Sequence, residues 1–473
     1  MNYRATFFAA VLALAAGLPA GAQQPVQSPL VGTWVGDLKA GALVLRLVFN
    51  VSVTNGVLGA TMDSPDQGAR GIPVSRVGLT GSDVVFEVKA AGGSYTGTLA
   101  ADGSTIEGAW KQSGQSFPVT LSRQEGAFVL DRPQEPKPPF PYTSVDVTFQ
   151  NAKAGVTLAG TLTIPPGPGP FPAVVLVTGS GPQDRNETLL GHKPFLVIAD
   201  FLSRSGIAVL RYDDRGVGLS KGTFAGATTL DFADDAEAAF TFLAARPEVD
   251  RRRIGIAGHS EGGLIAPLVA SRNPAVTFIV LLAGPGLPGD QLLLLQSEAI
   301  ARASGEDEKS IAAGSALNAA LYAIARRESD PAAITAQGRK VLEDALAAQT
   351  SLSEPDKAEA RKGIDKALAD LTAPWFRTFL ALDPAASLRT IRIPVLALDG
   401  TKDLQVPADA DLAAIDAALK AAGNTAYRIM KMQGLNHLFQ HAGTGLPDEY
   451  GKITETFAPE ALTAVRDFIL ALR

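Results

Sequence analysis

The sequence predicts an α/β chain with a mostly parallel central sheet, preceded by a small all-β domain. Three observations support this prediction. Residues 29–125 hold alternating apolar and polar runs with turn signals between them, which is typical of β-strands. From residue 142 onwards, short uninterrupted apolar runs alternate with helical segments, which indicates a parallel sheet covered on both faces. A proline-rich stretch, residues 126–141, separates the two regions and predicts an extended, solvated linker.

The bulk composition bounds the partners and the chemistry. A chain of 473 residues is too long for one ordinary core, so two folded domains and a targeting segment are expected. The net charge is −6 and no basic block is present, which argues against a nucleic-acid partner. The sequence contains 0 cysteines, which excludes disulfides, a thiol nucleophile, a cysteine metal site and lipid attachment through cysteine.

The first residues have the pattern of a cleaved export signal. Arg4 precedes an apolar stretch, Ala5–Leu18, and Ala20–Ala22 is a small-residue cleavage site. A membrane anchor is the alternative, but the stretch is short for a bilayer span. We therefore expect residues 1–22 to be removed, with no integral membrane span in the mature chain. The mature protein is expected in a periplasm or outside the cell.

The predicted all-β domain shows clear strand patterns. Residues 43–49 alternate with a period of two, and Asn55-Gly56 is a hairpin signal between two such runs. Further strands are expected at 83–89 and 94–99. Trp34 and Trp110 lie near the two ends of the domain, where they either fill the core or line a ligand cavity.

The α/β region, residues 142–473, is predicted to begin with a hairpin over 145–164. Its expected strands are 173–177, 208–212, 254–257, 278–283, 395–398 and 427–432, and its expected helices are 193–205, 230–246, one from Gly262, and 459–473. Residues 288–375 show helical spacing without a convincing strand, so they are expected to form a helical cap at the carboxyl edge of the sheet.

Two G-x-S-x-G patterns compete for a nucleophilic serine. Gly258–Gly262 lies between a predicted strand and a predicted helix, which is the context of a nucleophile elbow. Its glycines relieve collisions in such a sharp turn. Gly218–Gly222 is followed by a loop sequence. The context therefore favours Ser260 over Ser220 as the nucleophile.

A serine hydroxyl needs a general base, and the chain has 4 histidines. When a nucleophile elbow carries the serine, the acid and then the histidine follow it along the chain. This order excludes His192 and His259 as the general base. His437 follows the last predicted strand through a turn, at the edge where the base must lie. It is the predicted base, and His441 is the alternative.

The acid that orients the base should follow the strand 395–398. Asp403 lies in a turn beyond this strand and is the predicted acid, which would fix the tautomer of His437. Asp399 still belongs to the strand end, and Asp409 is expected at a helix start, where aspartate is a good cap.

An oxyanion needs two backbone N–H donors. One is expected from Glu261, the residue after the nucleophile, and the other from the loop after strand 173–177. Ser180 is the favoured donor of that loop and Gly181 the alternative, whereas Pro182 has no N–H.

With these residues placed, residues 142–473 resemble the α/β-hydrolase superfamily, and most closely secreted bacterial carboxylesterases with a small β domain in front. The motifs that carry the resemblance are 179–185 (GSGPQDR), 211–220 (RYDDRGVGLS), 258–263 (GHSEGG) and 434–437 (GLNH). The resemblance implies an α/β-hydrolase fold with a helical cap and a triad of Ser260, Asp403 and His437. The oxyanion loop lacks the His-Gly start of many relatives. The Asp213-Asp214-Arg215 turn is interpreted as a buried ion-pair network.

The function expected from these features is hydrolysis of small-molecule carboxylic esters, with short to medium acyl chains, through an acyl-enzyme on Ser260. No cofactor or metal is expected. The alternatives are a serine peptidase or aminopeptidase of the prolyl-peptidase type, a thioesterase, and a secreted ligand-binding protein with an inert hydrolase domain. The sequence leaves the oligomeric state open.

Overall fold

The computed structural model describes residues 28–40, 43–54, 56–67, 69–126, 128, 131–350 and 353–472. The predicted export signal, residues 1–22, and Asn55 of the predicted hairpin turn lie outside these residues. The chain divides into two compact units. The first consists of residues up to 64 and 69–129, and the second consists of 65–68 and 130 onwards.

The first unit is an antiparallel sheet of nine strands in its described part, in the order β4-β3-β2-β1-β9-β8-β7-β6-β5. The strands are β1 Gly32–Ala40, β2 Leu43–Thr54, β3 Val57–Ser64, β4 Ala69–Pro73, β5 Arg76–Thr80, β6 Asp83–Val88, β7 Gly93–Leu99, β8 Thr105–Gln112 and β9 Gln115–Gln124, with a short helix η2 Lys89–Ala91. Trp34 and Trp110 are buried in its core, and each indole N–H has a protein acceptor, Leu30 O and Gln112 Oε1 respectively. These tryptophans therefore fill the core of the unit.

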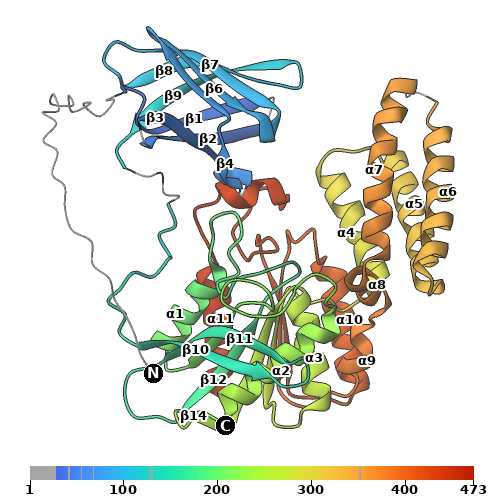
Figure 1. Ribbon diagram of the computed structural model, residues 1–473. Coiled ribbons are helices and arrows are strands. Elements are labelled where there is room, and N and C mark those ends of the chain that lie inside the picture. Colours follow the sequence, from blue (N-terminus) through green and yellow to red (C-terminus); the bar gives the residue numbers. More distant parts are fainter. Residues whose placement is uncertain are drawn as a thin grey trace, which may run out of the picture. The chain divides into compact units, whose positions relative to one another are not determined.

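The second unit is built on an eight-stranded sheet in the order β10-β11-β13-β12-β14-β15-β16-β17 (Figure 1). Its strands are β10 Thr143–Asn151, β11 Val156–Ile164, β12 Phe171–Val177, β13 Ala208–Tyr212, β14 Val249–His259, β15 Phe278–Leu282, β16 Val395–Gly400 and β17 Tyr427–Met432. From β13 to β17 neighbouring strands pair in parallel, and β10 and β11 are antiparallel. An all-β unit is thus followed along the chain by a unit with a mostly parallel sheet, which confirms the predicted fold class.

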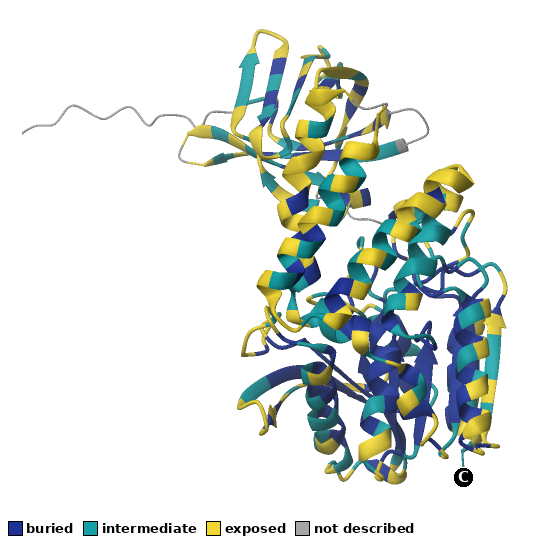
Figure 2. Ribbon diagram, turned by 90° about the vertical axis from the view of Figure 1, so that its right-hand side faces the viewer, coloured by how far each residue is buried: buried dark blue, intermediate teal, exposed yellow. Residues whose placement is uncertain are grey.

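Helices cover both faces of this sheet, and its inner strands β12, β13, β15 and β16 are almost entirely buried, whereas the edge strand β10 is largely exposed (Figure 2). One face packs against α2 Thr229–Ala244, α3 Glu261–Arg272, α9 Pro384–Leu388 and α10 Ala408–Ala421, and the other against α1 Pro194–Arg204 and α11 Pro459–Ala471. Short helices η1 Pro65–Gln67 and η3 Pro447–Lys452 complete the unit. Continuous apolar strands are explained by burial on both faces.

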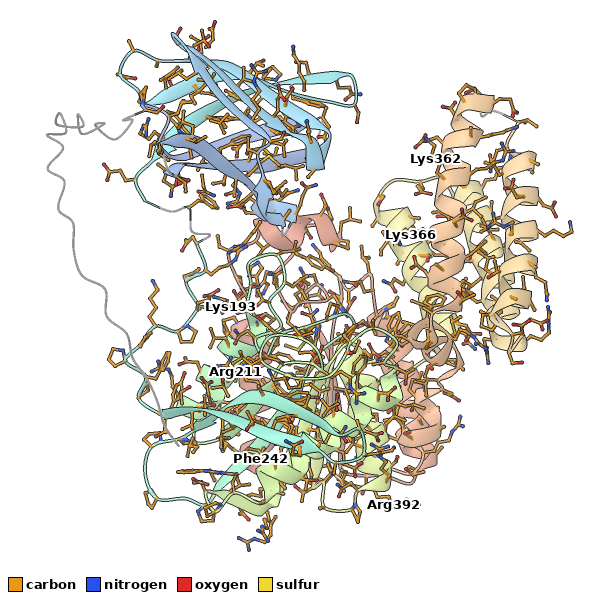
Figure 3. The ribbon with its side chains drawn as sticks, in the orientation of Figure 1. Lys193, Arg211, Phe242, Lys362, Lys366 and Arg392 are labelled. Carbon is orange, nitrogen blue, oxygen red and sulfur yellow. The ribbon has the colours of Figure 1, made fainter. Side chains whose placement is uncertain are left out.

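The predicted cap is helical, as expected, and lies between β15 and β16. It consists of α4 Gly289–Ala303, α5 Glu308–Arg327, α6 Pro331–Ala348, α7 Glu354–Thr372 and α8 Pro374–Ala381. Its helices are amphipathic: Ile334, Leu368 and Leu380 are buried in a core of its own. Lys362 and Lys366 project from α7 into solvent (Figure 3). The cap is thus a helical bundle inserted at the carboxyl edge of the sheet.

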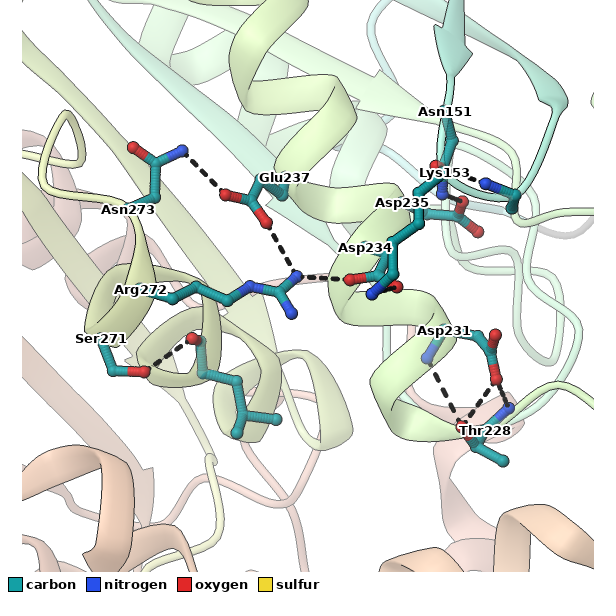
Figure 4. A network of polar contacts seen from close by, with 12 residues as sticks. Asn151, Lys153, Thr228, Asp231, Asp234, Asp235, Glu237, Ser271, Arg272 and Asn273 are labelled. Carbon is teal, nitrogen blue, oxygen red and sulfur yellow. Dashed lines mark hydrogen bonds and ion pairs between the residues drawn. The ribbon is translucent and has the colours of Figure 1, made fainter.

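A polar network fixes α2 between its neighbours (Figure 4). Asn151 of β10 donates to Asp235 of α2 at 2.6 Å. Arg272 of α3 pairs with both Asp234 and Glu237 of α2, at 2.8 and 2.9 Å. These contacts tie the hairpin, α2 and α3 together beside the sheet.

The predicted solvated linker, residues 126–141, differs from the structure at Arg132 and Gln134. Arg132 is 7% exposed, and its guanidinium donates to the carbonyl oxygens of Gly451 and Ile453, both at 2.8 Å. Gln134 exchanges hydrogen bonds with the backbone of Thr456 and Phe457. Proline content predicts an extended backbone, but not which of the intervening side chains bind the domain that follows.

Candidate active site

The candidate residues meet at the carboxyl edge of the parallel sheet, the usual place for a site in such sheets. The loop after β12 carries Ser180, the end of β14 leads into Ser260, and the turns after β16 and β17 carry Asp403 and His437. A cavity of about 230 Å³ opens there, and Ser180, Ser260, Glu261 and His437 are among the residues that line it.

Ser260 occupies a sharp turn between β14 and α3. Its φ of 52° and ψ of −119° are a strained conformation for a residue with a side chain. Close backbone contacts require glycine at the neighbouring positions 258 and 262. A Cβ at Gly258 would lie 1.9 Å from the carbonyl oxygen of Gly262, and a Cβ at Gly262 would lie 2.1 Å from that of Val177. The turn therefore has the geometry predicted for a nucleophile elbow.

Ser220, the alternative serine, makes hydrogen bonds within the fold. Its hydroxyl donates to the carbonyl oxygen of Asp213 at 2.7 Å and accepts from the N–H of Ala159 at 2.9 Å. The side chain is buried away from the cavity lining. The structure thus separates the two G-x-S-x-G patterns, because the Ser220 hydroxyl is bonded within the fold and Ser260 lines the cavity.

Asp403 and His437 form a buried pair. The Nδ1 of His437 lies 2.7 Å from Oδ2 of Asp403, and both side chains are 5% exposed or less. The other oxygen of Asp403 accepts from the N–H groups of Gln405 and Val406, at 2.7 and 2.9 Å. Two backbone donors and an imidazole stabilise a carboxylate here, which leaves Nε2 of His437 as the free ring nitrogen.

The alternatives to this pair lie elsewhere. The side chain of His441 is 55% exposed and pairs with Glu455 and Glu460, at 2.9 and 3.0 Å. Asp409 lies in the first turn of α10, where Pro407 rather than Asp409 precedes the helix, and its exposed carboxylate pairs with Lys431. Neither His441 nor Asp409 is among the described residues that line the cavity.

Asp399 is close to the pair but differs in charge. It is 1% exposed, and burial, followed by the charge of Asp403, raises its pKa well above the ordinary value. Asp411 is fully buried nearby, and burial raises its pKa to about 6. Burial therefore opposes ionisation of both neighbours of Asp403, and more strongly at Asp399 than at Asp411.

The loop after β12 presents the expected oxyanion donors. The N–H of Gly179 is already bonded to Oε1 of Glu187 at 2.8 Å. Ser180 lines the cavity, whereas Gly181 does not appear in that lining. Glu261 is the first residue of α3, so its N–H has no partner within the helix. This geometry favours Ser180 over Gly181.

The Asp213-Asp214-Arg215 turn supports this loop. Asp214 accepts from Thr178 Oγ1 at 3.0 Å and from the N–H of Gln183 at 2.9 Å, at either end of the loop. Burial raises the pKa of Asp214 to about 8. Its two neighbours make ion pairs, Asp213 with Arg185 at 2.7 Å and Arg215 with Asp235 at 2.6 Å. Asp214, the middle residue of the predicted ion-pair network, therefore accepts hydrogen bonds but forms no ion pair in these contacts.

Three contributors were missed by sequence reasoning because their partners are far away in the chain. Trp375 of α8 donates from Nε1 to Oε1 of Glu261 at 2.8 Å, which joins the cap to the residue after the nucleophile. His259 and Glu187 form a second buried acid–histidine pair, 2.8 Å apart. The only signal for His259 was its place beside Ser260, and none marked Glu187 or Trp375.

The remaining histidine, His192, lies in the interior of the fold. The ring of His192 is fully buried, bonds to Thr456 Oγ1 and the carbonyl oxygen of Tyr450, and has a pKa lowered to about 4 by burial. Among the described residues, no group of three or more histidine or acidic side chains has the arrangement of a metal site. None of the described helices is both long and apolar enough to span a bilayer.

Comparisons with known proteins bear on this site. Residues 194–441, just over half of the chain, match the family described as serine aminopeptidase, S33. The esterase EstD of Thermotoga maritima is 32% identical over 309 residues, which is 62% of this chain and 61% of that protein. The chain thus spans about three fifths of this relative's length.

Other similarities are shorter or more distant. The mitochondrial acyl-coenzyme A thioesterase 2 of Homo sapiens is 32% identical over 127 residues, 26% of this chain and 23% of that protein. Among solved structures, an esterase of Pyrococcus furiosus has a TM-score of 0.42 at 17% identity, covering 74% of this chain and 99% of the other.

Proposed function

The chain belongs to the α/β-hydrolase family described as serine aminopeptidase, S33, and from this premise we propose that it is a serine hydrolase that cleaves carboxylic esters. The observation that carries the proposal is a single cavity lined by an elbow serine, Ser260, and by His437, whose ring is bonded to Asp403 at 2.7 Å. The similarity to an esterase, EstD, supports the choice of ester.

The proposed reaction proceeds in two steps. The Nε2 of His437 takes the proton of Ser260 as its Oγ attacks the carbonyl carbon, and Asp403 stabilises the imidazolium that forms. The N–H groups of Glu261 and Ser180 donate to the oxyanion. The carbon–oxygen bond to the alcohol then breaks, and His437 returns the proton to the departing oxygen. Water, activated by the same nitrogen, hydrolyses the acyl-enzyme.

The cavity favours short to medium acyl chains. Its volume of about 230 Å³ lies below the range of roughly 300–1,000 Å³ typical of sites for drug-sized ligands. Leu292, Phe379 and Val406 form a buried apolar cluster beside the site and are among the residues that line the cavity. An apolar, small site fits a short acyl group better than a polymer or a long chain.

The charges of the lining argue for esters over aminoacyl substrates and coenzyme A thioesters. An aminopeptidase must hold a substrate ammonium, yet the lining carboxyl groups of Glu187 and Glu261 already bind donors of the protein itself. A coenzyme A substrate carries phosphates, and no lysine or arginine is among the described residues that line the cavity.

The test is active-site labelling combined with turnover. We expect purified protein to react with a fluorophosphonate at Ser260 and to hydrolyse p-nitrophenyl acetate or butyrate. Ser260→Ala and His437→Gln should each lose at least about a thousand-fold in kcat, whereas His441→Gln should retain wild-type activity. Absence of labelling in folded protein would favour a non-catalytic ligand-binding function.

The same assay separates the related hydrolase functions. We expect faster turnover of p-nitrophenyl esters than of aminoacyl anilides or acyl-coenzyme A at equal concentration. Faster anilide turnover would assign the protein as a peptidase, and faster acyl-coenzyme A turnover as a thioesterase.

Export is the remaining part of the proposal. The pattern of residues 1–22, a positive start, an apolar stretch and a small-residue cleavage site, supports export. Mass spectrometry of the protein expressed with its native start should find Gln23 as the first residue. A retained Met1 in the cell's soluble fraction would contradict export.

A further inference from the structure

A second acid–histidine pair lies beside the proposed triad. The Nδ1 of His259 is 2.8 Å from Oε1 of Glu187, although the two residues are 72 positions apart in the chain. Both side chains are buried, His259 at 6% and Glu187 at 3% exposure. The acyl-transfer steps described above give neither residue a task.

The contacts of His259 define its protonation. Its Nε2 lies 2.9 Å from the carbonyl oxygen of His437, and a carbonyl only accepts, so Nε2 carries a hydrogen. Its Nδ1 faces a carboxylate oxygen that also accepts the N–H of Gly179. Burial opposes a charged ring, but the charge and hydrogen bond of Glu187 outweigh it and raise the pKa of His259. The contacts of both ring nitrogens of His259 therefore favour the protonated ring, in which each nitrogen donates a hydrogen bond.

The pair connects three segments that the reaction needs. Glu187 holds Gly179 of the oxyanion loop, and a Cβ at Gly179 would lie only 3.1 Å from Cβ of Ser260. His259 directly precedes Ser260, at the end of β14. Through its Nε2 it also holds the backbone of His437. Glu187 itself has a φ of 53°, a strained value that persists only where surrounding contacts fix it.

We propose that Glu187 and His259 form a permanent carboxylate–imidazolium pair that positions the oxyanion loop and the base loop around Ser260. This inference rests on the proposed hydrolase function for its kinetic consequence, but the charge state of the pair is independent of it. The pair acts through Gly179 and His437, so both residues are positioning residues.

The charged groups that face His259 are few. Glu187 is its direct partner, the ring of His437 lies with its centroid 4.8 Å away, and the negative charge of Asp403 also raises its pKa. A fixed positive charge beside His437 is balanced by Glu187, which is why the two members are expected to act as a unit.

The charge state is tested by NMR on wild-type protein with histidine-selective isotope labelling. The chain has only 4 histidines, so the ring signals can be assigned with single His→Gln variants. We expect both ring nitrogens of His259 to remain protonated across the neutral pH range, above the ordinary histidine pKa of about 6.5. A neutral His259 with an unprotonated Nδ1 in this range would overturn the proposal, whatever the activity.

The positioning role is tested by kinetics. His259→Gln and Glu187→Gln each keep a similar side-chain volume and remove the charge. We expect each to lower kcat by about a hundred-fold with KM changed by less than about three-fold, because displaced groups weaken the transition state more than substrate binding. The double variant should lose about as much as either single one, since the pair acts as a unit.

The matched control is His441→Gln, which removes another histidine paired with glutamate, outside the cavity lining. We expect wild-type kcat for this variant. If His259→Gln and Glu187→Gln are folded and as active as His441→Gln, the positioning role is wrong. If wild-type protein neither hydrolyses esters nor reacts with the fluorophosphonate, the proposed function is wrong, and the NMR titration still decides the charge state.

Discussion

At the scale of single residues, charge rather than position distinguishes the two aspartates after β16. Asp403 accepts hydrogen bonds from two backbone N–H groups and from Nδ1 of His437, so both of its oxygens have donors. Asp399 makes one backbone bond, to the N–H of Gly400, and its pKa is raised by burial. Sequence reasoning ranked the two by distance from the strand end, and the contacts supply the physical reason.

This contrast predicts opposite results for two isosteric substitutions. Asp399→Asn imitates a protonated carboxyl group, so we expect kcat for p-nitrophenyl butyrate to stay within about three-fold of wild type. Asp403→Asn removes the charge that stabilises the imidazolium of His437, so we expect a loss of about a thousand-fold or more. Comparable losses in both variants would mean that the two carboxyl groups share the role of orienting the base.

Asp214 is expected to make the free energy of unfolding depend on pH. Its pKa is about 8 in the folded protein because of burial, whereas an unfolded aspartate ionises near about pH 4. Between these values the unfolded chain has released a proton that the folded chain keeps, so the contribution of Asp214 to stability falls as pH rises. The limiting slope is about 1.4 kcal/mol per pH unit.

Asp214→Asn should remove this dependence. An asparagine can accept from the N–H of Gln183 and donate to the hydroxyl of Thr178, so the two contacts of Asp214 are retained. Urea unfolding at about pH 5 and pH 8 should show the variant gaining stability relative to wild type at the higher pH. A difference that does not change with pH would show that Asp214 is ionised in the folded protein.

At the scale of elements, the parts that sequence predicts well are those defined by local patterns. β13 and β17 begin and end where the predicted strands 208–212 and 427–432 do, because runs rich in apolar residues favour strands in a parallel sheet. The elbow was found because glycine spacing and its strand–helix context are also local.

What sequence could not supply are contacts between distant segments. Glu187 and His259 meet across 72 positions, and Trp375 meets Glu261 across 114. Nothing in the local pattern of these residues differs from that of a polar loop or a helix surface. The sequence therefore predicts neither the acid–histidine pair beside Ser260 nor the bond between the cap and the elbow. Chain order excludes His259 as the base in the sequence-based prediction, and no other role is predicted for it.

Adding a single methyl group should abolish activity at Gly262 of the elbow and should be tolerated at Gly314 of the cap. Gly262→Ala would place Cβ 2.1 Å from the carbonyl oxygen of Val177, so β12 and α3 must separate. We expect loss of activity and a melting temperature lowered by several degrees. Gly314→Ala in α5 meets nothing within 4 Å and should stabilise the helix by up to about 1 kcal/mol. A Gly262→Ala variant with wild-type activity would contradict the required close approach.

At the scale of the whole molecule, the residues of the candidate site all belong to the second unit. The anchoring of Arg132 and Gln134 shows that this unit begins before its first strand, β10. The boundary between the two compact units therefore lies within the proline-rich stretch rather than at its end.

This boundary can be tested with two truncations, one starting at residue 131 and one at residue 142. Both lack the first unit and residues 65–67, so those losses cancel in the comparison. The longer chain keeps the guanidinium of Arg132, which donates to the carbonyl oxygens of Gly451 and Ile453, and hydrogen bonds from charged groups contribute about 1.5–3 kcal/mol. We expect the longer chain to hydrolyse p-nitrophenyl butyrate and the shorter one to melt several degrees lower. Arg132→Met in the full-length chain should show the same direction of change, because it leaves the buried carbonyl oxygens without their donor. Equal melting temperatures for the two truncations would place Arg132 and Gln134 outside the folded unit in solution.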